Sequence, residues 1–375
     1  MMNKTIKKGL NSEVNDNDTK PKKKRIFYFD QIRALAIVLV VMIHVCNAFM
    51  KAHTRGSAIW MIPSFTKGFC VIAVPLFLMI SGALLLNRNY ELKDFLSRRF
   101  IRLILPVIFW GIIYILLKTY SDASSLNIMS FYDTVLWFLN NAYWFSWMLI
   151  GVYLFIPVVN SFIKEYGLRG VEYFLVIWFI YLILYSFDIY PLWQIDISYF
   201  AGFIGFVILG YYINNKDFNL SPKKMFIIGL VIYLTVSLVN CHLRTTLPHP
   251  GELVERQGVL AVLQSCGIFL FIKYFAIHSE NNPKSFSNRI YSFFKDTVIG
   301  KLTFIISICS YGIYLTHYYF LLMGCGWINK NIFPIYSANP IKAMPIILVF
   351  VVISSTLLVL LASKIPHLKK WTGIG

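Results

Sequence analysis

The sequence predicts an all-α protein that crosses a membrane many times. Hydrophobic residues make up 58% of its 375 residues and charged residues only 14%, with a mean hydropathy of +0.64. Soluble domains carry about 25% charged residues, so this balance indicates a polytopic membrane protein. Its apolar segments are also long enough for membrane-spanning helices, which need about 20 residues each.

Ten apolar segments of this kind alternate with more polar loops. They lie at about 31–50, 68–87, 101–118, 134–159, 171–187, 198–213, 225–240, 258–277, 302–323 and 343–362. An even number of spans puts both termini on one side of the membrane. That side holds 26 of the 35 Lys and Arg residues and the other side holds 8, so the positive-inside rule predicts that both termini are cytoplasmic.

The net charge of +18 is explained by this topology, and we expect no nucleic-acid partner. Residues 1–26 are polar and end in a basic cluster at 22–25. They lack the apolar core of a signal peptide, so we expect a disordered cytoplasmic tail whose cations contact membrane lipids. The membrane domain is expected over 27–366, followed by a cytoplasmic C-terminal tail over 367–375.

Two ionisable residues, Arg33 and His44, lie inside the first apolar segment. Eleven residues at about 100° each bring both side chains to one helix face, roughly 16 Å apart along the axis. A charged side chain near mid-membrane costs at least about 2.5–3.5 kcal/mol. Both are therefore candidate functional residues, and Asp30, three residues before Arg33, is expected to pair with it.

The second apolar segment contains Pro75, which can loosen a helix, and the small pair Ser81 and Gly82. Small residues let membrane helices approach closely. The same pair also forms a small polar notch on the helix. The residues alone leave helix packing and ligand binding equally open.

Three arginines, Arg98, Arg99 and Arg102, lie where the chain enters its third apolar segment from the cytoplasm. Guanidinium groups bind phosphate oxygens bidentately, so an anionic cytosolic ligand fits there. Fixing the topology or binding lipid head groups is the alternative.

Aromatic and histidine side chains mark the fourth and ninth segments. Trp144 falls near the outer interface, while Tyr311, Tyr314 and His317 recur at a spacing of three on one helix face. Interfacial aromatic belts and hydrogen bonds between helices explain many such residues. Sugar-binding surfaces also use aromatic faces, so an acceptor site is the functional alternative.

The remaining motif search excludes several kinds of chemistry. The six cysteines occur singly, without a CxxC pair or zinc-ligand spacing, and we expect no metal. The chain has no P-loop, GxGxxG, GxSxG or HExxH motif. We therefore expect no permanently bound cofactor, and any chemistry must use groups inside the membrane domain.

Together these tracts resemble the acyltransferase 3 family of integral membrane acyltransferases. The resemblance is carried, in chain order, by YFDQIRALAIVLVVMIHV, VPLFLMISGALLL, RRFIRLILP, YWFSWMLIGVYLFIPVV and SYGIYLTHYYFL. The chain is most similar to the single-domain branch that includes the O-acetyltransferase of enterobacterial common antigen. Arg33 and His44 match the family's pair in the first helix, Arg99 and Arg102 match its paired arginines, and Ser81 belongs to its small-residue motif.

This resemblance implies a ten-helix enzyme of the bacterial inner membrane. It would be an O-acetyltransferase that transfers the acyl group of cytosolic acetyl-CoA to a hydroxyl of a cell-surface or lipid-linked glycan. The acyl-CoA would be bound by Arg99 and Arg102 with help from Arg98 and Ser81. Its thioester would reach His44, which acts as a general base or briefly carries the acyl group.

The acceptor is expected near Trp144, Tyr314 and His317, while Arg33 would neutralise either the thioester oxyanion or the anion of CoA. Asp30 would hold Arg33 by an ion pair. A transporter or flippase for a lipid-linked or anionic substrate is the alternative. It is weakened by the lack of a convincing internal repeat, which secondary transporters often show.

Overall fold

The computed structural model describes residues 25–121, 132–133, 135–136, 143–189 and 202–375. The described residues form helices and connecting loops without a strand, and eight of the helices are long and apolar enough to cross a membrane. The all-α membrane class is therefore confirmed. Most of the expected basic tail, and the beginnings of the expected fourth and sixth spans, fall outside the described residues.

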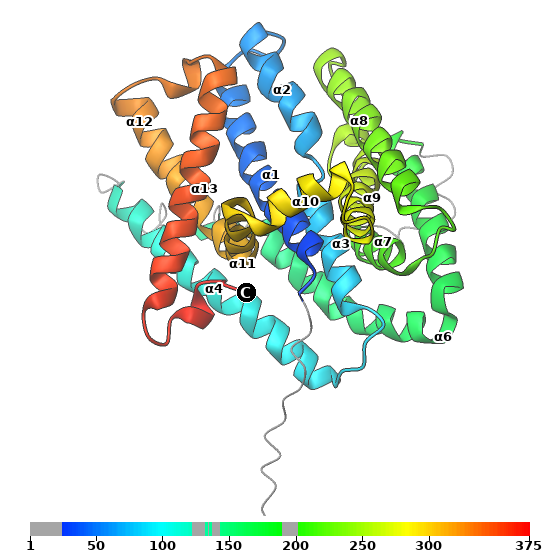
Figure 1. The fold of residues 1–375 in the computed structure, drawn as a ribbon. Helices are drawn as coiled ribbons and strands as arrows, with labels where there is room; N and C mark the ends of the chain where they lie inside the picture. The colour runs from blue at the N-terminus through cyan, green and yellow to red at the C-terminus, as the bar shows by residue number, and fades with distance from the viewer. Residues whose placement is uncertain (1–24, 122–131, 134, 137–142, 190–201) are drawn as a thin grey trace, which may run out of the picture.

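Figure 1 shows the arrangement of the helices. The longer ones are α1 (Phe27–Ala52), α2 (Ala58–Cys70), α3 (Ala73–Leu85), α4 (Leu92–Ser121), α6 (Trp144–Ser186), α7 (Ile204–Asn215), α8 (Pro222–Thr246), α9 (Val259–Asn281), α10 (Phe286–Asp296), α11 (Val298–Tyr318) and α13 (Pro340–Lys364). The short elements are η5 (Glu252–Val254), η6 (Tyr319–Cys325), α12 (Gly326–Asn331), η7 (Ile335–Ser337) and η8 (Lys369–Trp371).

The described residues contain eight candidate spans where ten were expected, and two regions account for the difference. The 43-residue α6 joins the later part of the expected fourth span to the expected fifth span and bends between them at Gly167, whose φ of 60° favours glycine. Helix α7 lies in the expected sixth span 198–213, whose first four residues fall outside the described part of the chain, and its 12 residues are therefore not counted among the eight spans. The count of ten and the cytoplasmic termini stay predictions.

The expected span 68–87 is wrong in its start, because a single span of two consecutive helices begins ten residues earlier. Helices α2 and α3 together cover Ala58–Leu85 and break at Val71 and Ile72. Pro75 has no N–H to donate to the carbonyl of Val71, four residues before it. The loosening expected from Pro75 is therefore found one turn upstream of the proline.

Helix α1 lies in the middle of the molecule and packs against α2, α3, α11 and α13. In Figure 1, α12 and α13 lie on one side of it and α7, α8 and α9 on the other. Helix α11 continues into η6, a π-helical segment. Such segments are rare and are frequent at functional sites.

Helices α3 and α7 approach each other through glycines. A Cβ atom on Gly82 would lie 1.7 Å from the carbonyl oxygen of Val207, and one on Gly210 would lie 2.0 Å from that of Met79. Of the two interpretations of the Ser81 and Gly82 pair, packing therefore accounts for Gly82.

The C-terminal residues fold back onto the bundle. Thr372 is buried, and its carbonyl accepts a hydrogen bond from Trp110 Nε1 on α4 at 3.1 Å. The backbone N–H of Gly375 donates to the carbonyl of Ile308 on α11 at 2.9 Å. The expected tail over 367–375 is thus part of the packed structure, between α4 and α11.

We predict that Gly82→Ala destabilises the protein, because its methyl group would force α3 away from the α7 backbone. Overpacking of this kind costs about 1–3 kcal/mol, so the melting temperature in detergent should fall by several degrees. Gly151→Ala on α6 is the matched control, since a Cβ there meets nothing within 4 Å. A Gly82→Ala protein that melts no lower than Gly151→Ala would contradict the packing argument.

Candidate active site

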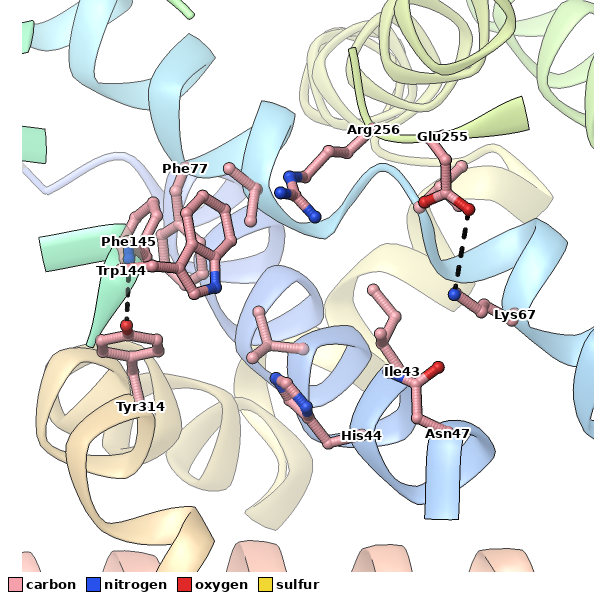
Figure 2. A pocket seen from close by; sticks show the side chains of 13 residues that line it. Ile43, His44, Asn47, Lys67, Phe77, Trp144, Phe145, Glu255, Arg256 and Tyr314 are labelled. Atoms are coloured by element: carbon pink, nitrogen blue, oxygen red, sulfur yellow. Dashed lines mark hydrogen bonds and ion pairs between the residues drawn. The ribbon is translucent and has the colours of Figure 1, made fainter. Parts of the chain in front are cut away.

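A pocket lies beside the C-terminal half of α1 and is lined by α1, α2, α3, α6, α11 and the loop before α9 (Figure 2). Valine, isoleucine and phenylalanine side chains form its apolar part. Its polar and aromatic lining consists of His44, Asn47, Lys67, Trp144, Glu255, Arg256 and Tyr314. An apolar pocket with a few convergent polar groups is the usual form of a small-molecule site.

His44 extends from α1 into this pocket (Figure 2). Its Nδ1 lies 3.0 Å from the hydroxyl oxygen of Tyr318 on α11. When Nδ1–H donates to that oxygen, the other nitrogen, Nε2, carries a lone pair. This is the state that a general base or a nucleophile needs. Sequence reasoning missed Tyr318, because nothing in the sequence pairs residues on two distant helices.

His317 lies next to His44, with 5.1 Å between the ring centroids, and is completely buried. Its Nδ1 is 2.6 Å from the carbonyl oxygen of Tyr314. Since a carbonyl only accepts, Nδ1 carries the proton and Nε2 is an acceptor. That Nε2 has no hydrogen-bond partner within the described part of the chain. The structure thus brings His317 directly to the histidine of α1.

Tyr314 and its neighbours on α11 hold the start of α6. The Tyr314 hydroxyl accepts a hydrogen bond from the backbone N–H of Phe145 at 3.3 Å. One turn before it, the Tyr311 hydroxyl lies 3.1 Å from Ser146 Oγ. These contacts position Trp144, the first residue of α6, in the pocket. Trp144, Tyr314 and His317, all expected at the acceptor site, therefore gather around His44.

A charged group on the opposite wall was missed from the sequence. It consists of Lys67 on α2, Arg244 on α8, and Glu255 and Arg256 in the loop after η5. Lys67 is the only charged residue of Ala58–Leu85, which marks it as a candidate functional residue. Sequence reasoning did not identify Lys67, because the expected span began one residue later, at residue 68. Glu255 and Arg256 carry no such signal, because they lie in a loop.

Arg33 lies outside the pocket, toward the N-terminal end of α1. Its Nη1 is 4.0 Å from Asp30 Oδ1 and 3.4 Å from Ser307 Oγ on α11. The expected pair with Asp30 is present, but the closer partner of that buried carboxylate is Arg25, with contacts of 2.5 and 2.6 Å. Ser307 also donates to Asp30 at 2.7 Å. Eleven helical residues, roughly 16 Å, separate Arg33 from His44.

The three arginines of α4 also lie outside the pocket. Helix α4 begins at Leu92, nine residues before the expected span, so all three are helical. Arg98 pairs with Asp94 at 2.6 Å, Arg99 lies over the ring of Phe95, and Arg102 is exposed.

Ser81, expected with these arginines at the acyl-CoA site, is also absent from the pocket lining. Its hydroxyl donates to the carbonyl of Phe77 on its own helix at 3.0 Å. Phe77 itself lines the pocket, so Ser81 lies one helical turn away from it.

Helix α11 connects the arginines to the histidines. The Tyr311 hydroxyl donates to the carbonyl of Leu103, the residue after Arg102, at 3.0 Å. His317 lies six residues further along α11, a rise of about 9 Å. A ligand that contacts both regions must therefore be long.

Comparison with known proteins identifies the family of the chain. A family model described as an acyltransferase domain matches residues 26–363, which include every helix from α1 to α12 and nearly all of α13. No curated protein and no solved structure matches the chain. The chain therefore belongs to the acyltransferase 3 family, and it is a membrane acyltransferase with His44 in a pocket of its helical bundle.

Proposed function

We propose that the protein is an O-acyltransferase of the bacterial inner membrane. It transfers an acyl group, in the simplest case acetyl, from cytosolic acyl-CoA to a hydroxyl of a cell-surface or lipid-linked glycan. The observation that carries this proposal is the imidazole of His44, which lines the pocket and is held at Nδ1 by Tyr318. An oriented imidazole is the group that acyl transfer to a hydroxyl requires.

The donor reaches His44 from the arginine end of the bundle. Arg25 and Arg33 share one carboxylate, Asp30, so this end keeps an excess of positive charge for the phosphates of CoA. Arg99 and Arg102 add two more guanidinium groups, which bind phosphate in a bidentate manner. The long pantetheine arm of CoA suits the separation between these cations and the pocket. This assigns Arg33 to the CoA anion instead of the thioester oxyanion.

The reaction follows from the geometry at His44. Nε2 takes the proton of the acceptor hydroxyl while the hydroxyl oxygen attacks the thioester carbonyl carbon. The tetrahedral intermediate collapses, the C–S bond breaks, and the CoA thiolate takes the proton back from the imidazolium. Alternatively, Nε2 attacks the thioester carbonyl carbon first, and the C–S bond breaks to release the CoA thiolate. The acceptor hydroxyl then attacks the acyl-imidazole, the C–N bond breaks to free the imidazole, and the hydroxyl proton passes to the thiolate. Trp144, Tyr314 and His317 surround the acceptor in both routes.

We predict that His44→Ala lowers acyl transfer by at least about 100-fold, because general-base catalysis is typically worth 10² to 10⁴-fold. The measurement is acetyl-CoA-dependent thiol release by the purified protein in lipid, with crude envelope glycan as acceptor. His242→Ala, which removes an exposed histidine outside the pocket, should retain activity. Normal release by folded His44→Ala protein would refute the proposed catalytic role.

We predict that Tyr318→Phe lowers kcat about fivefold and leaves the KM for acetyl-CoA unchanged. The substitution keeps the ring against His44 and removes the 3.0 Å hydrogen bond that orients the imidazole. A neutral hydrogen bond contributes about 1 kcal/mol, which corresponds to this change in rate. A rise in KM with an unchanged kcat would argue that Tyr318 binds the donor instead.

We predict that Arg102→Gln raises the KM for acetyl-CoA about tenfold or more with little change in kcat, since hydrogen bonds to charged groups are worth about 1.5–3 kcal/mol. Lys93→Gln is the matched control, because it removes the same charge from an exposed position of α4. Equal KM values for the two variants would exclude Arg102 from the CoA site.

A further inference from the structure

The pocket beside His44 has a cationic wall that the reaction described above does not use. Lys67 reaches it from α2, and Arg256 reaches it from the loop between η5 and α9 (Figure 2). Glu255 is the single carboxylate that lines this pocket among the described residues. The balance of charge at this wall therefore depends on what Glu255 neutralises.

Glu255 is paired mainly with a third cation, Arg244. Arg244 is only 5% exposed, and its Nη1 donates to Glu255 Oε1 at 2.9 Å. Its Nη2 donates to the carbonyl of Val254 in the same loop. The same Glu255 oxygen lies 3.9 Å from Lys67 Nζ, which is too long for a hydrogen bond. Glu255 is thus within ion-pair distance of Arg244 and Lys67 but balances only one charge, and the pocket keeps a positive charge.

Arg256 has no carboxylate partner within the described residues, and an aromatic ring fixes it instead. Its guanidinium carbon lies 4.3 Å from the ring centre of Trp144. Stacking occupies the face of the guanidinium plane and leaves its N–H groups free to donate within the plane. The guanidinium group of Arg256 is therefore held in one orientation, with paired N–H donors that can bind a carboxylate or phosphate bidentately.

The phosphates of CoA do not suit this wall. When the thioester lies at His44, the pantetheine arm keeps the phosphates away from the same pocket. The wall also lies near Asn47, beyond His44 on α1, whereas Arg33 lies about three turns before it. An anion bound by Arg256 and Lys67 therefore belongs to the acceptor.

We infer that Arg256 and Lys67 form an anion-binding subsite that selects an acidic saccharide as the acceptor. They bind its carboxylate or phosphate group and hold a neighbouring hydroxyl against His44, while Trp144 packs against both the sugar and Arg256. This inference rests on the proposed function and specifies its acceptor class. Arg256 and Lys67 are specificity residues, because they bind the acceptor and take no proton.

The test is competition in the thiol-release assay with crude envelope glycan. Three probes are compared as inhibitors: neutral methyl N-acetylglucosaminide, methyl glucuronide with a carboxylate, and N-acetylglucosamine 1-phosphate. In the wild type, at least one acidic probe should inhibit at least tenfold more strongly than the neutral probe. The stronger acidic probe identifies the carboxylate or the phosphate as the group recognised.

Arg256→Gln should weaken inhibition by that acidic probe at least tenfold and change inhibition by the neutral probe less than twofold. Arg256→Lys keeps the charge without the planar fork and should give an intermediate value. Arg55→Gln is the matched control, because Arg55 also stacks on a tryptophan, Trp60, but lies outside the pocket. Each probe should inhibit Arg55→Gln as strongly as it inhibits the wild type.

Different results would refute the anion-binding subsite and the acyltransferase activity. The wild type can show acetyl-CoA-dependent thiol release that all three probes inhibit equally or not at all. This result overturns the anion-binding subsite and leaves the acyltransferase proposal standing. The anion-binding subsite is also overturned if every probe inhibits Arg256→Gln as strongly as it inhibits Arg55→Gln. The absence of any release by the wild type overturns the proposed function itself.

Discussion

The interface between α1 and α11 is held by polar contacts near both ends, and the rest of the site depends on it. Toward one end, Ser307 donates to the buried carboxylate of Asp30, and toward the other, the Tyr318 hydroxyl meets Nδ1 of His44. In the apolar interior of a membrane, an unsatisfied polar group costs several kcal/mol. Two such contacts therefore fix both the register and the rotation of one helix against the other. The orientation of the imidazole follows from this register, as does the placement of His317 beside it.

Positive charge gathers at two separate regions of the bundle, with the histidines between them. Arg25 and Arg33 lie at the N-terminal end of α1, while Lys67 and Arg256 lie beside its C-terminal half. Isolated charges are costly in this environment, so each region keeps one carboxylate and a surplus of cations. Under the proposed function, an anionic donor and an anionic acceptor approach a neutral base from different ends. The same fold thereby keeps the two substrates apart except at the reacting atoms.

Local sequence rules predicted the helices and the residues that stand out within them. Hydropathy predicted the membrane class, and the cost of burying charge singled out His44, which lines the pocket together with Trp144. The rules failed where the determining contact joins distant segments. The partner of His44 is 274 residues away in the chain, and Lys67 lay just outside a span whose start was misjudged. Glu255 occupies a loop, where no periodicity restricts residue type, so only the tertiary structure reveals its role.

In the inferred acceptor subsite, the location of Arg256 in a loop separates part of the acceptor choice from the packing of the helices. His44, the proposed catalytic residue, lies on α1, whose neighbours fix its position, whereas the loop between η5 and α9 contributes few residues to the core. A change at Arg256 therefore alters the chemistry of the pocket wall and its contact with Trp144, and leaves the residues of the helical core in place. Under the inferred subsite, a new acceptor preference needs only a few substitutions in this short segment. A single membrane scaffold can in this way serve acceptors of different charge while its acyl-transfer machinery stays the same.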